Sequence, residues 1–423
     1  MQVIRHPDKK EYSKLVQRPY VDNTAIVNAV QVILNAVKQH GDEALWSFTK
    51  KFDGVELKNF SVTEAEILTA SESIPENLKK AITQAIKNIE RFHKAQLKDA
   101  EIIQTMEGVE CWRKTVGIEK VGLYVPGGTA PLFSTVLMLA IPAQLAGCKE
   151  IILCTPCNKE GVVHPAVLYS AQLVGVTRIF KVGGAQAIAA MAYGTESIPA
   201  VHKIFGPGNQ YVTAAKQLIQ MTGVSIDMPA GPSEVCVWAD ETADASFVAA
   251  DLLSQAEHGT DSQVLLVSKD ETVVKNIQQE IEKQLALLPR KEIAEKALAH
   301  SKAIIVTSNE EALNLINEYA AEHLIISCKN ADQLAAEVVN AGSVFIGNYS
   351  PESAGDYASG TNHTLPTNGF AKAYSGVSVD SFVKKITYQK LTKKGLENIS
   401  RTVIDMAEAE GLQAHANAVK VRL

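Results

Sequence analysis

Residues 120–154 read KVGLYVPGGTAPLFSTVLMLAIPAQLAGCKEIILC, and this stretch decides the fold. It opens on a short apolar run, turns through glycines, continues as an apolar helical segment and closes on a second apolar run. A strand, a helix and another strand in this order are typical of a βαβ unit with parallel strands. The alternation continues downstream and predicts a first open sheet with strands at 121–125, 150–154, 178–182 and 203–205, and helices such as 134–146 and 185–193.

A second alternating series follows. Its expected strands are 235–238, 263–267, 303–306, 324–327 and 343–346, with helices such as 243–257 and 270–288 between them. We therefore predict an α/β protein with two Rossmann-like open parallel-sheet domains and with helical N-terminal and C-terminal extensions. The boundary between the two sheets is expected near residues 228–232.

The remaining segments set the predicted domain limits. Residues 1–115 are expected to be mainly helical, with one helix from Asn23 or Thr24 to His40 and another over 76–96. Residues 347–380 are rich in glycine and proline and form no clear element, which favours a functional segment. The tail is helical and too small to bury its apolar face alone, so it must dock on the main body or on a second subunit. The expected divisions are 1–22, 23–120 together with 233–378, 121–232, and 379–423.

Composition narrows the class of protein. The chain has 423 residues, a net charge of −6 and no long cluster of lysine and arginine, which argues against nucleic acid as the main partner. The six cysteines are scattered through apolar segments, a pattern of reduced thiols rather than of a disulfide framework. The start lacks the apolar core of a signal peptide, and no apolar run reaches the ~20 residues of a membrane span. We expect a cytoplasmic protein.

Three glycine-rich turns follow strands of the first predicted sheet. They are Pro126-Gly127-Gly128, Gly183-Gly184 and Gly206-Pro207-Gly208-Asn209. Ligands of open parallel sheets bind outside the carboxyl ends of the strands, and glycine lets the backbone approach a pyrophosphate closely. The standard G-x-G-x-x-G fingerprint is absent. The residues alone leave open whether these turns hold a dinucleotide or only join strand to helix.

Polar side chains gather in the second half. Gln255 and His258 are three residues apart at a helix end, a spacing that suits two zinc ligands but also an ordinary helix terminus. Glu322 and His323 lie at a helix-to-strand junction and could abstract a proton, or could be a solvated Glu beside a partly buried His. The segment from Gly355 to His363 contains Asp356, a hard anionic ligand, or forms an Asx-type turn.

Two further motifs are ambiguous or structural. Glu408, Glu410 and His415 end the tail, where a charged helix end is the ordinary explanation. Cys154-Thr155-Pro156-Cys157 has the redox C-x-x-C spacing, but it follows a strand and leads into a loop instead of opening a helix. No second pair completes a four-cysteine zinc site, so we assign these cysteines a structural role.

The run from Ile226 through Met228-Pro229-Ala230-Gly231-Pro232-Ser233 to Glu234, continued by 254–258, resembles the signature of the histidinol dehydrogenase family. Residues 122–128, 205–209 and 355–363 and the tail from Glu408 to His415 are similar to that family as well. The resemblance covers nearly the whole chain. It implies oxidation of L-histidinol to L-histidine in two NAD⁺-dependent steps through an enzyme-held aldehyde, the last step of histidine biosynthesis.

The resemblance also implies roles for individual residues. The zinc ligands would be Gln255, His258, Asp356 and His415, and the metal would anchor the substrate without being redox active. These four, with Ser233, His323, His363 and Glu410, would bind the substrate. Tyr124, Gln186 and Asn209 would line the NAD site, which falls in 121–232, while the catalytic and metal residues fall in 233–378. The family forms homodimers, and the tail would reach the partner's site.

In the implied mechanism, His323 takes the hydroxyl proton in the first oxidation, and Glu322, helped by His323, activates water for the second. Three alternatives differ in substrate or class. A related enzyme would oxidise another small polyol, and a nucleotide-binding scaffold would bind NAD without forming NADH. A zinc hydrolase would leave the glycine turns of the first sheet unexplained.

Overall fold

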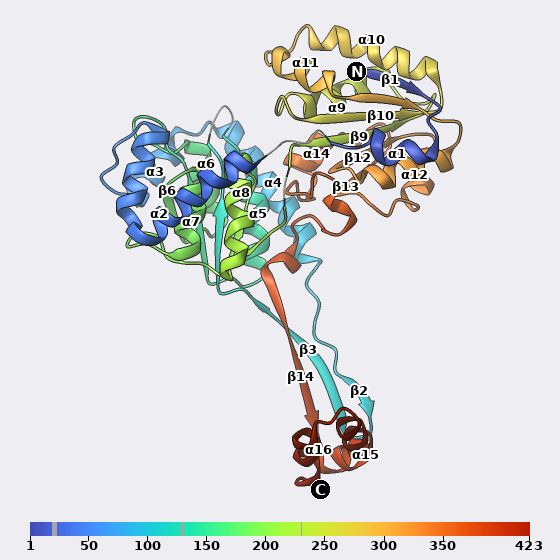
Figure 1. Ribbon diagram of the computed structural model, residues 1–423. Helices are drawn as coiled ribbons and strands as arrows, with labels where there is room; N and C mark the ends of the chain where they lie inside the picture. Colours follow the sequence, from blue (N-terminus) through green and yellow to red (C-terminus); the bar gives the residue numbers. More distant parts are fainter. Residues whose placement is uncertain (19–22, 128–130, 230) are drawn as a thin grey trace.

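The computed structural model describes residues 1–18, 23–127, 131–229 and 231–423. Two helix-covered parallel sheets form two bodies side by side, and a narrow antiparallel stalk ends in a pair of helices away from both (Figure 1). The α/β class with two open parallel sheets is therefore confirmed. No helix in the described part of the chain is long and apolar enough to cross a membrane.

The first sheet has five parallel strands in the order β6-β5-β4-β7-β8. Their bounds are Lys120–Tyr124 (β4), Glu150–Thr155 (β5), Arg178–Lys181 (β6), Lys203–Phe205 (β7) and Ser225–Ile226 (β8). The helices between them are Phe133–Leu145 (α5), Pro165–Leu173 (α6), Gly184–Tyr193 (α7) and Gln210–Ile219 (α8), which a 3-10 turn at Gln220–Thr222 (η3) follows. All four predicted strands are present, and only the short β8 was not predicted. Helix α5 is apolar on all sides because neighbouring elements bury most of its surface.

The second sheet has six parallel strands in the order β1-β11-β10-β9-β12-β13. Their bounds are Gln2–Arg5 (β1), Glu234–Ala239 (β9), Gln263–Ser268 (β10), Lys302–Ile305 (β11), His323–Ser327 (β12) and Ser343–Ile346 (β13). The helices of this body are Ala245–Ala256 (α9), Glu271–Leu285 (α10), Lys291–Ala299 (α11), Asn309–Tyr319 (α12) and Ala331–Ala335 (α13). Apart from β1, both sheets share the chain order 3-2-1-4-5, so the order reverses between β4 and β7 and between β9 and β12.

The N-terminal elements differ from the predicted division. They are Lys9–Glu11 (η1), Tyr12–Leu15 (α1), Thr24–Phe48 (α2), the π turn Thr49–Asp53 (η2), Glu64–Ser73 (α3) and Glu76–Lys94 (α4). Strand β1 pairs with β11, so residues 1–18 belong to the second sheet and are not a helical extension. The predicted helix to His40 continues to Phe48 across a kink at Gly41.

Residues 24–94 also pack on the other body from the one expected. Helix α2 packs on α7 and α8, α3 on α6, and α4 on α5. The apolar faces of these helices join the core of the first sheet, as Leu34 and Ile89 show by being fully enclosed. The assignment of residues 23–120 to the second domain therefore differs from the structure. The sequence showed which face of each helix is apolar but not which sheet that face would meet.

The stalk is an antiparallel sheet of Ile103–Met106 (β2), Val109–Gly117 (β3) and Val383–Leu391 (β14) in the order β14-β3-β2. At its base Phe382 is buried and stacks on Phe205 at a ring distance of 3.9 Å, which joins the stalk to the first sheet. Its far end carries Lys393–Ala409 (α15) and Gln413–Lys420 (α16). Both tail helices were predicted, but the stalk strands were not, because most of their residues are exposed or only half-buried.

Residues 347–380 contain one short helix, Glu352–Tyr357 (α14), and the 3-10 turns Phe370–Lys372 (η4) and Val379–Phe382 (η5), the second ending just past this segment. The rest of this segment is irregular, as predicted, and it lies between the two sheets. Asn362 donates to the Met138 carbonyl of α5 at 2.6 Å, and Asn368 N donates to Glu234 at 2.9 Å. The segment therefore contacts both bodies.

Candidate functional site

The predicted catalytic and metal residues, apart from His415, come together at the amino edge of the second sheet. His323 is the first residue of β12, and β12 pairs with β9, which begins at Glu234. Across from them lies α5 of the first body, where Thr135 contacts His363 Nε2 at 3.0 Å. Helix α5 follows the carboxyl end of β4, so the site lies between the carboxyl edge of one sheet and the amino edge of the other.

Glu322 and His323 are both buried and both contact the backbone of Glu234. The Glu234 N–H donates to Glu322 Oε2 at 2.9 Å. His323 Nδ1 lies 3.1 Å from the Glu234 carbonyl oxygen and 2.9 Å from Gln255 Nε2. The other ring nitrogen, Nε2, is buried without a hydrogen-bond partner and faces Asp356 Oδ1 at 3.6 Å. The ring is thus held on one side and open on the side of Asp356.

Burial and charge shift the pKa values of these groups in different directions. Burial raises the pKa of Glu322 to about 7, against the attraction of His323. Burial alone would lower the pKa of His323, but the charges of Glu322 and Asp356 outweigh it and raise the value to about 10. Burial would raise the pKa of Asp356, yet the contact with His323 lowers it. The three form a buried system with two carboxyl groups around one imidazole.

Three predicted metal ligands of this chain lie near His323, with Gln255 on the Nδ1 side of the ring and Asp356 on the Nε2 side. Gln255 is buried in the last turn of α9, and its Oε1 has no hydrogen-bond partner. His258 lies two residues after the end of α9. Part of the residue is exposed, but burial of its imidazole lowers the pKa of His258 and favours the neutral ring. Asp356 on α14 supplies a carboxylate. An unpartnered amide oxygen, a neutral imidazole and a carboxylate match the donors that zinc accepts, so these residues fit a divalent cation.

The single chain does not complete this set. Among the residues that the structure describes, no three His, Cys, Asp or Glu side chains converge as metal ligands. His415 on α16 and Glu410 at the end of α15 are exposed at the far end of the stalk, away from α9 and α14 (Figure 1). Gln255, His258 and Asp356 lie near one another around His323 and remain predicted ligands, whereas the two tail residues lie outside the cluster of their own chain.

The other predicted substrate residues lie around the cluster. His363 Nδ1 lies 2.9 Å from the Asp356 carbonyl oxygen, and burial lowers the pKa of His363, so it can hold a proton on Nδ1 and present Nε2 toward Thr135. Ser233 is half-buried directly before Glu234, and its carbonyl accepts from the Gln263 N–H at 3.2 Å. Both therefore border the segment that carries Glu322 and His323.

Two groups in the site were missed by the sequence interpretation. Glu352, one turn before Asp356 on α14, is almost fully buried; its Oε1 accepts from Ser254 Oγ at 3.1 Å, and its Oε2 has no partner. Arg18 forms a two-pronged ion pair with Glu234 at 2.8 and 2.7 Å. A buried Arg–Glu contact across more than two hundred positions leaves no periodic signal. A Glu in the first turn of a helix is ordinary, so the sequence did not single out Glu352 either.

The predicted cofactor residues all follow strands of the first sheet. Tyr124 ends β4, and its hydroxyl accepts from the Gly184 N–H at 3.0 Å, while burial raises its pKa to about 12. Gln186 is buried in the first turn of α7. Asn209 caps α8 and accepts from the Tyr211 and Val212 N–H groups, both at 3.1 Å. These residues flank the β4–β7 reversal, where dinucleotides bind in open sheets.

The glycine turn after β7 is shaped by a buried ion pair. Gly206 has a φ of +125°, and a Cβ there would lie 2.0 Å from the Tyr124 carbonyl oxygen. Its N–H donates to Asp227 at 2.8 Å, and its carbonyl accepts from Lys216 Nζ at 2.8 Å. Lys216 and Asp227 pair with each other at 2.5 Å. The turn is therefore held by hydrogen bonds to both the N–H and the carbonyl of Gly206. Gly128, in the turn after β4, lies outside the described residues.

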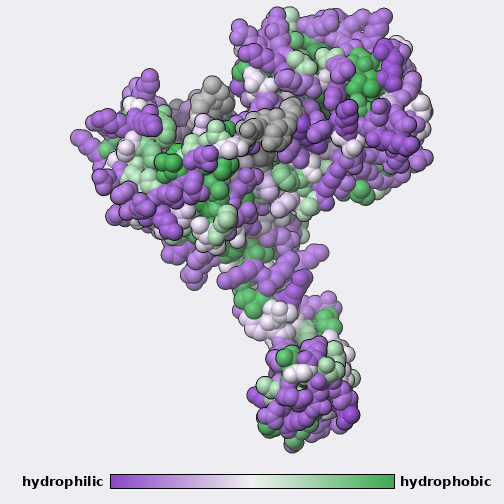
Figure 2. Space-filling model, in the orientation of Figure 1, coloured by the Kyte–Doolittle hydropathy of each residue, from purple (hydrophilic) through white to green (hydrophobic). Residues whose placement is uncertain are grey.

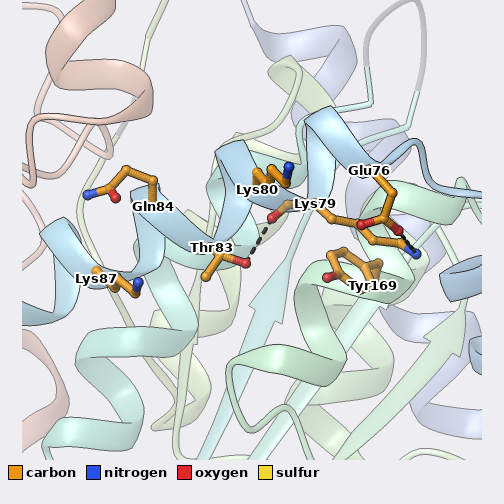
Figure 3. Close-up of a pocket in the computed structure, with 7 residues that line it drawn as sticks. All are labelled: Glu76, Lys79, Lys80, Thr83, Gln84, Lys87 and Tyr169. Atoms are coloured by element: carbon orange, nitrogen blue, oxygen red, sulfur yellow. Dashed lines mark hydrogen bonds and ion pairs between the residues drawn. The ribbon is translucent and has the colours of Figure 1, made fainter.

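Two surface cavities are separate from this cluster. A groove of about 380 Å³ lies along α4 and is lined by Glu76, Lys79, Lys80, Thr83, Gln84, Lys87 and Tyr169 (Figure 3). Its lysines stand on one exposed helix face, and none of the buried acid–base residues borders it. A second cavity of about 470 Å³ borders residues 54–63 and 159–162. The acid–base chemistry therefore belongs to the buried cluster and not to these openings.

The cysteines do not form a redox site. All six are free, and burial raises the pKa values of Cys154 and Cys157 above the ordinary value of a thiol. A raised pKa keeps both thiols protonated and poorly nucleophilic. This agrees with the structural role predicted for them.

Comparison with known proteins identifies a family. The model of the histidinol dehydrogenase family matches residues 16–423. A histidinol dehydrogenase of Bacteroides fragilis is 59% identical over 423 residues, covering 100% of this chain and 99% of that protein.

Solved structures agree with that match. The crystal structure of histidinol dehydrogenase from Elizabethkingia anophelis superposes with a TM-score of 0.98 at 55% identity, covering 100% of this chain and 98% of that one. An aldehyde dehydrogenase from Staphylococcus aureus, named for betaine aldehyde, reaches a TM-score of 0.50 at 12% identity, covering 91% of this chain and 88% of that one. The second likeness concerns the fold alone.

The environment of Glu352 predicts a pH-dependent effect of one substitution. Burial raises the pKa of Glu352 from 4.5 to about 8. As the pH rises from 4.5 to 8, the carboxyl group ionises more readily in the unfolded chain than in the folded protein, so the folded protein loses stability. Glu352→Gln removes this cost and keeps an acceptor for Ser254. The quantity to compare is the change in unfolding free energy caused by Glu352→Gln relative to the unchanged protein. We expect this change to be about 1–3 kcal/mol more stabilising at pH 8 than at pH 5.

Urea denaturation of chelator-treated protein at the two pH values measures this difference. Glu241→Gln, at an exposed position, is the control and should change stability equally at both pH values. An equal effect of Glu352→Gln at pH 5 and pH 8 would contradict the burial argument.

Proposed function

The chain belongs to the histidinol dehydrogenase family of NAD-dependent oxidoreductases, and we propose that it oxidises L-histidinol to L-histidine through an aldehyde that stays bound. The alcohol loses a hydride and a proton to give the aldehyde. Water adds to the aldehyde, and the resulting hydrate loses a second hydride and proton to give the acid. NAD⁺ is the hydride acceptor in both oxidations.

The observation that carries the proposal is the buried Glu322–His323 pair with an unpartnered Nε2. A base must lie within hydrogen-bond reach of the proton that it takes, and the open side of the His323 ring provides such a position. A carboxyl group with a pKa near 7 stands beside it and can exchange protons at neutral pH. His323 as a base and Glu322 as a group that titrates near neutral pH suit two successive oxidations, because each oxidation releases a proton.

Gln255, His258 and Asp356 would hold zinc, with His415 of a second copy as a further ligand. When bound, the metal supplies a Lewis-acid anchor for the nitrogen atoms of the substrate. Three donors from one chain leave coordination positions for substrate and for the fourth protein ligand. Gln255 Oε1, which has no partner in the chain, supports this assignment.

His323 must be neutral before it can accept the hydroxyl proton. Its pKa is held up by the carboxylates of Glu322 and Asp356. A cation held by Asp356 would offset the charge of that carboxylate and would lower the pKa of His323, which favours the neutral ring that can act as a base. Glu322, bonded to the Glu234 N–H, would then orient and deprotonate the water that attacks the aldehyde.

Other residues would bind and orient the two substrates. His363 and Ser233 border the cluster and would contact the polar groups of histidinol. Tyr124, Gln186 and Asn209 would line the NAD site at the carboxyl edge of the first sheet. Because the first turn of α5 lies at that edge and contacts His363, the hydride acceptor and the substrate would meet between the two sheets.

We further propose a homodimer in which the tail of one subunit completes the site of the other. Glu410 and His415 stand at the end of the stalk, where they cannot serve their own cluster. The stalk and tail expose Ile103, Met106, Ile386, Tyr388, Met406, Leu412 and Val421, and apolar surface is visible there in Figure 2. A second subunit would cover this surface and gain two substrate ligands.

The decisive experiment counts NADH per histidinol consumed. The proposal predicts two NADH per molecule of histidine formed, with no free aldehyde released. Chelation should lower the rate about 100-fold or more, and zinc should restore it. A ratio of one NADH, or a preference for a simple polyol over histidinol, would overturn the proposed substrate.

Two substitutions separate the proposed acid–base roles. His323→Asn should nearly abolish oxidation of the alcohol, by about 100-fold or more, because the proton acceptor is lost. Glu322→Gln should slow the aldehyde-to-acid step more than the alcohol step, because water activation is impaired. Rates with histidinol and with histidinal measure the two steps separately, and small, equal losses in both variants would argue against these roles.

Tail exchange can be tested by mixing two inactive variants. In a mixed dimer of His323→Asn and His415→Ala subunits, one site has both His323 and the partner's intact tail. Unfolding and refolding a 1:1 mixture should therefore recover about a quarter of the unchanged activity, because half of the dimers are mixed and each has one good site. No recovery, with dimers formed normally, would show that the tail does not complete the partner's site.

A further inference from the structure

The catalytic pair rests on a residue that neither oxidises nor binds the substrate. Glu234 contributes its backbone N–H to Glu322 and its carbonyl oxygen to His323, at 2.9 and 3.1 Å. These two groups lie on either side of the Glu234 Cα, so a shift of the backbone at this one residue would displace the partners of both side chains together. The position of Glu234 therefore sets the geometry of the base and of the neighbouring carboxyl group at once.

The side chain of Glu234 is fully engaged. Its Oε1 accepts from Arg18 Nε at 2.8 Å and from the Asn368 N–H at 2.9 Å, and its Oε2 accepts from Arg18 at 2.7 Å. The carboxylate of Glu234 is 1% exposed and the Arg18 side chain 14%. A buried, two-pronged Arg–carboxylate pair fixes distance and angle together, which a single point contact does not.

Arg18 also reaches the other side of the catalytic pair. Its guanidinium lies 4.0 Å from the ring centroid of Tyr319, the last residue of α12. From Tyr319 the chain passes Ala320, which has a φ of +52°, and reaches Glu322 and His323 within four residues. One guanidinium thus contacts both the start of β9 and the segment that leads into β12.

We propose that Arg18 and Glu234 are positioning residues for Glu322 and His323. The pair holds the backbone of Glu234 so that its N–H meets the carboxylate of Glu322 and its carbonyl meets the imidazole of His323. This inference rests on the catalytic roles proposed above. It adds the N-terminal segment, which lies more than two hundred residues from β9 in the sequence, to the catalytic machinery of the second sheet.

The test replaces the pair without leaving a buried charge. Arg18→Met combined with Glu234→Met exchanges a buried ion pair for apolar side chains of similar length, a change that often leaves stability intact. We expect kcat to fall about 10-fold or more in both oxidation steps, because displaced catalytic groups lose reactivity steeply. KM for NAD⁺ and bound zinc should change less than about twofold. With substrate deuterated at the carbinol carbon, the isotope effect on kcat should rise as the chemical step becomes slower.

The matched control is Arg5→Met combined with Glu271→Met. Arg5 and Glu271 form an exposed Arg–Glu pair between β1 and α10 of the same body, without contact to Glu322 or His323. The control should keep kcat and the isotope effect. If the Arg18–Glu234 double variant fails to fold, Arg18→Lys, which keeps the charge but loses the two-pronged contact, provides the same measurements.

A crystal structure of the double variant gives a reading that does not depend on activity. We expect the Glu322 carboxylate to leave the Glu234 N–H. If this hydrogen bond persists, or if kcat stays within about twofold of the unchanged protein, the positioning role is wrong. Failure of the unchanged protein to form NADH from histidinol would instead refute the proposed function, and the two failures are therefore distinguishable.

Discussion

Two buried ion pairs hold the connection between the two sheets. Asp227, just after β8, pairs with Lys216, and Glu234, which opens β9, pairs with Arg18. Breaking such a pair by removing one partner leaves a buried charge and costs about 3–5 kcal/mol, so each end of the connection has a strong reason to stay in place. At one end the Lys216–Asp227 pair shapes the Gly206 turn. At the other end the Arg18–Glu234 pair holds the backbone of Glu234, which contacts Glu322 and His323. The residues at the two ends of this connection, Asp227 and Glu234, are thus each held by a buried ion pair.

The site is also defined by an excess of buried negative groups. Glu322, Glu352 and Asp356 surround His323, while burial keeps His258 and His363 largely neutral. Such a cluster is costly unless protons or cations occupy it, and the raised pKa values of Glu322 and Glu352 are one response. A divalent cation and an amine-bearing substrate would be another. The charge pattern therefore fits the proposed zinc and histidinol without any further basic residue.

Much of the fold was predictable because buried parallel strands have clear apolar runs, as at β4, β5, β9 and β10. Strands β3 and β14 were missed because Lys384, Lys385 and their neighbours face solvent, so no apolar alternation marks them. The sequence also could not show that β1 joins β11 or that α2 meets α7, because both depend on long-range docking.

The site was predicted in part for related reasons. Gln255, His258, Asp356, Glu322 and His323 were found from local patterns and from family resemblance, and the structure brings them together in one cluster. Arg18 and Glu352 had no such signal, since their partners are distant in sequence.

The stalk has a further consequence. It separates α15 and α16 from both sheets, so these helices find cover only in each other within the described chain. In the proposed dimer, further cover would come from the partner and would follow mass action, so dilution would empty the sites of their tail ligands while each sheet body stays folded.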